Sequence, residues 1–515
     1  MKAKKFFLGL LLLLALGLLC PGWGQAYYLT EIWAFTGDQS FTVWDVQGSP
    51  AVGDDGTIYA GTATNGYVFA LHPDGTLKWV TELGGSFYFN PAIAPDGSII
   101  IHNSDVLFAL NPADGSIKWE VHGDIAGIKF YGAPAVSKQG VVYIGSSANT
   151  LYAFEPSQGN LKWHFQVTMP SFATVGIFFS PVINAAGTIY CLYTAIEEIG
   201  GAQRIYRLYA IEPEFGNPKY PDKPCQNLAS MTYLLQQDSW PAIGPDGTIY
   251  VAGDHIFAIR PDLSIKWDYH PPSLYGSGSP VIAEPLNPGE DYPIVMDYGY
   301  NHIIGVSLQG QLSWDFTADY EVNKPAIGKG RLICFSATGP GYTWVGQLYL
   351  LFYYYPDALP EQLDKIEMEG PVYSSSTVVR SGDQNLLYVG SRYSVSAWNI
   401  GVVTGQAPGL AHTSWPCDRG NLKRNGRVSV AFSALYSVGQ LMVQVDVLHL
   451  GNYAVSLGSK LESARQSLEK EDLVPARNKL NAFINEVRAL KGKKILAKEA
   501  DSLIADAQGI VGLLQ

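Results

Sequence analysis

The sequence predicts an all-β, eight-bladed propeller followed by a small all-α bundle, with seven blades as the alternative. Two observations carry this prediction. A unit of four short apolar segments recurs between residues 50 and 398, and the hydrophobic pattern becomes helical from about Val438. A single four-stranded blade cannot bury both of its faces, whereas a ring of stacked blades buries them and hides most strand edges.

Each copy of the unit opens with Pro and a small apolar pair, passes through a Gly turn into an Ile-Tyr strand, and closes on Lys-Trp. The first copy runs from Pro50 to Trp79. Successive copies start about 40–60 residues apart, and four short strands at that spacing are typical of propeller blades. Later copies start at Pro91, Pro134, Pro181, Pro241, Pro280, Pro325 and near Thr377.

The last copy lacks a closing Lys-Trp strand, and a matching segment stands upstream of the first copy at residues 31–35. We therefore expect the N-terminal segment to complete the eighth blade and join the two ends of the ring. The seventh copy diverges after Leu350, which keeps seven blades as the rival count.

The repeated Trp is interpreted as structural: it docks on the neighbouring blade, where a buried large aromatic side chain contributes a few kcal/mol at about 25 cal/mol/Å². The Asp-Gly pairs, such as Asp55-Gly56, fall between two strands and predict hairpin turns in preference to calcium ligands. The blade-docking residues are Trp33, Trp79, Trp119, Trp163, Trp267 and Trp314.

Residues 1–26 are predicted to be a signal peptide. Three lysines precede an apolar run at residues 6–19, and Gly24 and Ala26 offer a small-x-small cleavage site. Lipidation at Cys20 is the less favoured alternative, because Leu19 is bulky. We expect a secreted protein, extracellular or periplasmic, with no transmembrane segment after cleavage.

The remaining chain divides into a propeller at 27–416, a polar linker at 417–436 and a helical bundle at 437–515. In the bundle, Lys491, Lys493 and Lys494 surround Gly492, and we interpret this cluster as helix capping in preference to contact with an anionic surface. The formal net charge of -12 argues against a nucleic-acid partner.

Four cysteines remain in the chain expected after cleavage. Cys191 and Cys334 occupy matching strand positions in separate blades, too far apart for the usual disulfide geometry, and are expected to be buried thiols. Cys225 and Cys417 lie in Pro-adjacent, loop-like segments and form the better candidate pair.

The propeller motif resembles the repeats of the PQQ-like (pyrroloquinoline-quinone-type) β-propeller superfamily, over roughly residues 31–428. Residues 151–154 and 159–163 carry the motif clearly. This resemblance implies the fold but leaves the function open, since the superfamily includes quinoprotein alcohol dehydrogenases and an outer-membrane barrel-assembly scaffold. The tail at 478–487 and 492–495 looks like the FIMAH domain, which implies an extracellular setting.

By resemblance, a quinoprotein would hold PQQ between a floor Trp and a disulfide of adjacent cysteines, with calcium beside a catalytic Asp. The chain has no Cys-Cys pair, no His-x-x-x-His and no Gly-x-Ser-x-Gly motif. We therefore assign no catalytic, cofactor-binding or metal residues, and PQQ and calcium enter only under the alternative of a quinoprotein-type oxidoreductase.

The favoured function is a non-catalytic binding or assembly scaffold for a protein or polysaccharide partner at the cell envelope. Loops on the blade faces would bind the partner, and aromatic loop residues suit this role. For the blade-seven insertion, at about residues 339–370, the favoured interpretation is a degenerate third strand with its turn, and partner binding is the alternative. The candidate partner-binding residues are Tyr342, Trp344, Tyr353, Tyr354 and Tyr355.

Overall fold

The computed structural model describes most of the propeller and nearly all of the C-terminal helices. Among the described residues there are eight β-sheets and four α-helices. The described residues are 27–38, 41–123, 129–168, 176–197, 203–223, 225–228, 240–253, 255–271, 278–283, 294–298, 300–328, 332–339, 345–352, 359–372, 374–381, 384–402, 430–448, 450, 452–470 and 472–514.

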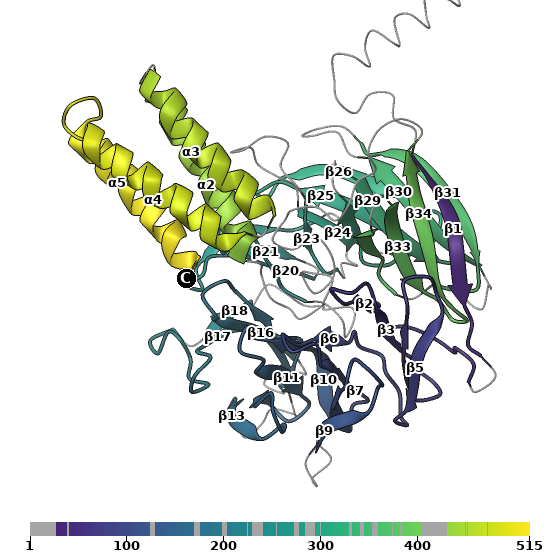
Figure 1. Cartoon of the computed structure of the whole chain (residues 1–515). Coiled ribbons are helices and arrows are strands. Elements are labelled where there is room, and N and C mark those ends of the chain that lie inside the picture. The colour runs from purple at the N-terminus through teal and green to yellow at the C-terminus, as the bar shows by residue number, and fades with distance from the viewer. Residues whose placement is uncertain are drawn as a thin grey trace, which may run out of the picture.

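Each sheet is one blade, with antiparallel strands that run in order from the centre of the ring to its rim (Figure 1). Blade 1 contains β2 (Ala51–Val52), β3 (Ile58–Gly61), β4 (Tyr67–Leu71) and β5 (Leu77–Glu82). Blade 2 contains β6 (Ala92–Ile93), β7 (Ile99–His102), β8 (Val106–Leu110) and β9 (Ile117–His122). Blade 3 contains β10 (Phe130–Val136), β11 (Val142–Ser146), β12 (Thr150–Phe154) and β13 (Leu161–Gln166).

Blade 4 is enlarged to five strands: β14 (Ile177–Phe178), β15 (Val182–Ile183), β16 (Ile189–Glu197), β17 (Gln203–Ile211) and β18 (Cys225–Asn227). Blade 5 contains β19 (Ala242–Ile243), β20 (Ile249–Ala252), β21 (Ile256–Ile259) and β22 (Ile265–Tyr269). Blade 6 contains β23 (Val281–Ile282), β24 (Ile294–Tyr298), β25 (His302–Val306) and β26 (Leu312–Thr317).

Blade 7 is likewise five-stranded: β27 (Glu321–Val322), β28 (Ala326–Gly328), β29 (Leu332–Thr338), β30 (Val345–Phe352) and β31 (Glu361–Glu369). Blade 8 combines β32 (Thr377–Ser381), β33 (Gln384–Gly390) and β34 (Val395–Val402) with the N-terminal strand β1 (Tyr27–Phe35). The predicted count of eight blades is confirmed.

Strand β1 closes the ring as predicted. It pairs antiparallel with β34 from Tyr27 opposite Val402 to Phe35 opposite Val395, so the first and last segments of the propeller share one sheet. The backbone amide of Leu29 also donates a 2.8 Å hydrogen bond to Asp364 in the outer strand of blade 7. Figure 1 shows β1 beside β34 and β31 at the rim. Strand β1 is therefore held by blade 8 through its pairing with β34 and by blade 7 through Asp364.

The hydrophobic core lies between the blades. One cluster of buried residues joins blades 1 and 2, and it includes Tyr59 and Trp79 from the first blade and Phe108 from the second. Further clusters repeat this arrangement at the other junctions. This is the packing expected when each sheet hides its faces against its neighbours.

The C-terminal helices are α2 (Val430–Val447), α3 (Asn452–Glu469), α4 (Leu473–Leu490) and α5 (Ala497–Leu513). They share one core, and Ala185 of blade 4 packs against it. Helix α2 starts at Val430, inside the segment predicted as linker. Figure 1 places the bundle on one side of the ring. Among the described residues, every helix is too short or too polar to cross a membrane.

Candidate functional site

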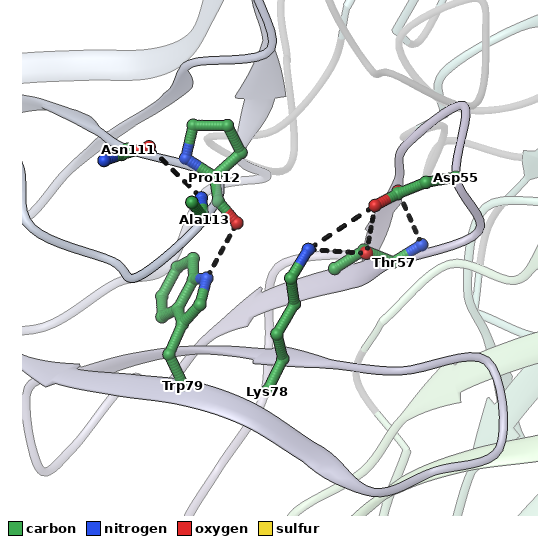
Figure 2. Close-up of polar contacts among 7 residues, drawn as sticks. All are labelled: Asp55, Thr57, Lys78, Trp79, Asn111, Pro112 and Ala113. Carbon is green, nitrogen blue, oxygen red and sulfur yellow. Dashed lines mark hydrogen bonds and ion pairs between the residues drawn. The ribbon is translucent and has the colours of Figure 1, made fainter.

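The repeated Lys-Trp motif joins neighbouring blades. In blade 1, the indole Nε1 of Trp79 donates a 3.0 Å hydrogen bond to the carbonyl oxygen of Pro112, in a turn of blade 2 (Figure 2). Four other predicted docking residues donate to the next blade in the same way. They are Trp33 to Pro73 at 3.1 Å, Trp119 to Pro156 at 2.8 Å, Trp163 to Pro213 at 2.9 Å and Trp267 to Leu308 at 2.7 Å.

A glycine lies beneath each of these indoles. Gly115, in the turn that receives Trp79, has a φ of +74°, and a Cβ atom there would lie 2.5 Å from the Trp79 ring. Only glycine combines this left-handed conformation with so close an approach. The same relation holds for Gly75 under Trp33, Gly159 under Trp119, Gly216 under Trp163 and Gly310 under Trp267. The Gly-x-x-x-Trp spacing thus encodes contact between successive blades.

The lysine of the motif acts within its own blade. Lys78 Nζ lies 3.1 Å from Thr57 Oγ1 and 3.4 Å from Asp55, and that carboxylate in turn accepts hydrogen bonds from the amide and hydroxyl of Thr57 (Figure 2). Lys118 with Asp96 and Lys266 with Asp246 repeat this arrangement. The Asp-Gly pairs therefore form hairpin turns, as predicted.

The junction between blades 4 and 5 lacks a Trp and is built differently. The hydroxyl of Tyr190 donates a 3.1 Å hydrogen bond to Pro261, the turn carbonyl that an indole contacts elsewhere. The position equivalent to Gly75 is Leu263, which is fully buried at a φ of +67°. The side chain of Leu263 and the phenol of Tyr190 together occupy the place that an indole fills at the other junctions.

Aromatic side chains fill the hub of the ring. Phe89 enters from blade 2 and Trp240 from blade 5, with their ring centroids 6.4 Å apart, and Tyr131 of blade 3 packs against both. Lys324 of blade 7 places its Nζ 4.3 Å from the centroid of Trp240. Side chains from blades that are not adjacent can meet only at the centre, so these residues mark the hub.

A buried histidine supports this aromatic group. His102 stacks on Phe89 with a centroid separation of 5.0 Å; its Nε2 lies 2.7 Å from the carbonyl of Gly132, and its Nδ1 accepts the amide of Ser104. Complete burial lowers the pKa of His102 to about 4. The imidazole is therefore neutral near pH 7, with both nitrogens engaged, and it braces the hub.

The hub residues were not predicted from the sequence, although a sequence signal precedes several of the blades. Phe89, Phe179 and Trp240 each stand one or two residues before the Pro that opens a repeat. That position leads into the innermost strand of a blade, so a large aromatic residue there points to the hub. Among the described residues, no group of three or more His, Cys, Asp or Glu side chains could hold a metal ion.

The predicted partner-binding residues Tyr342, Trp344, Tyr353, Tyr354 and Tyr355 lie outside the described residues. Trp314 is described and is 4% exposed, but residues 353–358 of blade 7 are outside the description, so its docking partner stays a prediction.

The cysteine predictions are tested in part. Cys191 and Cys334 are fully buried, as predicted, and burial raises the pKa of the Cys334 thiol to about 12. Cys225 is half-buried in β18, where burial raises its pKa. Cys417 lies outside the described residues, so its pairing with Cys225 stays a prediction.

Comparison with known proteins supports the type of propeller. Residues 30–195 match the family model described as outer membrane protein assembly factor BamB. A protein of that name from Yersinia pestis is 37% identical over 84 residues, which is 16% of this chain and 21% of the relative. The matched segment therefore spans about a fifth of that relative.

Solved structures agree on the fold. BamB from Moraxella catarrhalis aligns with a TM-score of 0.51 and 16% identity over 72% of this chain and all of that chain. The ring therefore shares the β-propeller fold of that structure. Quinohemoprotein alcohol dehydrogenase from Comamonas testosteroni aligns similarly, with a TM-score of 0.50 and 13% identity over 74% of this chain and 77% of that enzyme. At these identities only the β-propeller fold is shared.

Proposed function

We propose that this protein is an exported, non-catalytic binding or assembly scaffold of the cell envelope, and that loops on the blade faces bind a protein or polysaccharide partner. The observation that carries the non-catalytic part of this proposal is the filled hub, where Phe89, Tyr131 and Trp240 pack together and Lys324 lies over the Trp240 ring. The match of residues 30–195 to an outer-membrane assembly factor supports the same function and an envelope location.

The alternative, a quinoprotein-type oxidoreductase, needs an open tryptophan face on which the quinone can stack. The hub residues do not fit that requirement. Trp240 is only 4% exposed as a residue, and the ammonium group of Lys324 lies 4.3 Å from the centroid of its ring. A planar cofactor would have to displace the lysine and lose its cation–π contact.

Titration of the purified chain with PQQ and calcium separates the two functions. We expect no saturable quinone absorbance, no heat of PQQ binding and no dye reduction with primary alcohols. The Lys324→Ala variant, which uncovers the indole, is the matched comparison. Stoichiometric PQQ binding by the unaltered chain together with alcohol-dependent dye reduction would overturn the scaffold proposal.

We further propose that the aromatic residues of the blade-seven insertion contribute to partner binding and that residues 437–515 form a FIMAH-like module. The aromatic character of the insertion supports the first proposal, and the motif at 478–487 supports the second. Replacing Tyr353 and Tyr355 with Ala is expected to weaken partner binding at unchanged melting temperature. Unchanged affinity would remove these residues from the partner-binding surface.

A further inference from the structure

A second group of aromatic and polar side chains lies where blade 8 meets blade 1. Trp44, in the segment that leads into β2, is 41% exposed and meets Tyr393 edge-on with a centroid separation of 5.5 Å. The guanidinium of Arg392 lies 6.0 Å from the Trp44 ring and 5.8 Å from the Tyr393 ring. An indole left this exposed beside an arginine is typical of a binding surface.

Backbone contacts hold this surface in place from three loops. The amide of Asp45 donates to the carbonyl of Arg392 at 2.6 Å, and the carbonyl of Asp45 accepts from Ala63 at 2.8 Å. Thr64 Oγ1 donates to the Trp44 carbonyl at 3.3 Å. The segment before β2, the β3–β4 loop and the β33–β34 loop therefore form one preorganised patch, so binding would cost little further ordering.

The patch also carries features that packing alone does not require. Asp45 has a φ of +64°, which is uncommon for a residue with a side chain. Its Oδ2 accepts from Gln47 at 3.0 Å, whereas its Oδ1, although buried, meets no donor among the described residues. The same is true of Asn65 Oδ1, while Asn65 Nδ2 donates to the Thr42 carbonyl. A buried acceptor without a donor is costly, so packing alone does not explain either side chain.

We propose that the surface formed by Trp44, Asp45, Asn65, Arg392 and Tyr393 binds a neutral polysaccharide. A pyranose ring fits this surface: the apolar C–H face packs on the indole, hydroxyl groups hydrogen-bond to the partly exposed side chains of Asp45 and Asn65, and Arg392 donates to a hydroxyl or ring oxygen. Hydroxyls both donate and accept, which matches a patch that offers both functions. The patch carries one carboxylate, on Asp45, and one guanidinium, on Arg392, so its charges balance and suit a neutral ligand.

This inference rests on the proposed binding function and specifies its ligand class. The test uses the full chain expected after signal cleavage, with isothermal titration against cellohexaose, xylohexaose, mannohexaose and chitohexaose. We expect at least one of these neutral oligosaccharides to bind. The Trp44→Ala variant should bind it at least tenfold more weakly. Tyr300→Ala removes a 50%-exposed aromatic residue from the β24–β25 loop and is the matched control, expected to bind within twofold.

The Asp45→Gly variant separates a functional role from a structural one. Glycine adopts the φ of Asp45 without strain, so we expect an unchanged or higher melting temperature together with at least tenfold weaker binding. A lower melting temperature with unchanged affinity would make Asp45 structural and overturn its role in the site.

The remaining outcomes distinguish the site from the general function. If a glycan binds and Trp44→Ala binds it equally well, the site is wrong while the scaffold function stands. If all four oligosaccharides fail to bind, the polysaccharide inference is overturned. In that case a purified protein partner whose affinity depends on Trp44 would preserve the scaffold function and assign the surface to a protein.

Discussion

Trp79→Ala tests whether the Lys-Trp motif joins the blades. The Trp79 side chain is 7% exposed in the core between blades 1 and 2. Truncating a buried Trp typically costs 3–5 kcal/mol, and the Pro112 carbonyl would also lose its 3.0 Å hydrogen bond, worth roughly 1 kcal/mol. We expect the free energy of unfolding to fall by about 4 kcal/mol, and by about 1–2 kcal/mol for Trp79→Phe.

The measurement is guanidinium denaturation followed by far-UV circular dichroism, which does not depend on the altered fluorophore. Lys78→Met is the matched control on the same strand. Lys78 is 19% exposed and its partner Asp55 is 61% exposed, so the loss should stay below about 1 kcal/mol. If Trp79→Ala costs no more than Lys78→Met, the tryptophan does not couple the blades.

Gly115→Ala supplies the second half of this test. An alanine at position 115 would have to keep a φ of +74°, and its Cβ would lie 2.5 Å from the Trp79 ring. The variant should therefore be destabilised by about 2 kcal/mol or more. In the double variant with Trp79→Ala the clash with the ring is gone. The two losses should therefore sum to more than the measured total, by about 1 kcal/mol. Strict additivity would refute a direct contact between ring and turn.

Three further predictions concern the irregular parts of the ring. Leu263→Ala should cost about 3 kcal/mol in a denaturant titration, and Leu263→Gly about 1 kcal/mol less, because glycine removes the strain at φ +67° but not the cavity; equal losses would contradict this. Asp364→Ala should speed hydrogen exchange at the Leu29 amide in β1 and leave exchange in β5 unchanged, because only the Leu29 amide loses its 2.8 Å hydrogen bond. Unchanged protection of β1 would show that Asp364 does not hold this strand. Burial lowers the pKa of folded-state His102 to about 4 from its ordinary value of 6.5, so between these values the unfolded state binds more protons and stability falls as pH falls. His102→Gln should remove that part of the pH dependence, at most roughly 3 kcal/mol, and an unchanged profile would assign it to other groups.

The repeat made the ring predictable from the sequence. Each copy supplies an independent instance of the same strands and turns, so errors in one copy matter little. The absence of a closing Trp strand in the eighth copy, and its presence at Trp33, predicted the closure that β1 and β34 make. Helix α2 was less clear, because its first residues are apolar and aromatic, and the helical period becomes distinct only near Val438.

The hub and the surface around Trp44 were not predicted, because both depend on contacts between segments distant in sequence. Phe89 and Trp240 are about 150 residues apart, and the repeat pattern gives no distance across the ring. Leu263 is harder still to recognise. It occupies the place of a turn glycine, and a leucine in that place does not reveal that its φ is positive. The surface around Trp44 is equally hard to recognise, because the sequence does not reveal the positive φ of Asp45 or the burial of its Oδ1 atom.

The enlarged sheets and the junctions without a Trp both occur at blades 4 and 7. Blades 4 and 7 have five strands, and their outermost strands, β18 and β31, carry no Trp. Their outgoing junctions use other contacts: Tyr190 to Pro261 at the first, and Asp364 to Leu29 at the second. Blade 4 also receives the helical bundle through Ala185. A Trp–Gly junction requires a short turn of defined shape in the next blade, so it constrains both partners. At the junction between blades 4 and 5 the turn keeps that shape, since Leu263 has a φ of +67°, and only the indole is replaced. We therefore expect mutations at the five Trp–Gly junctions to reduce ring stability more than equivalent truncations in the insertions.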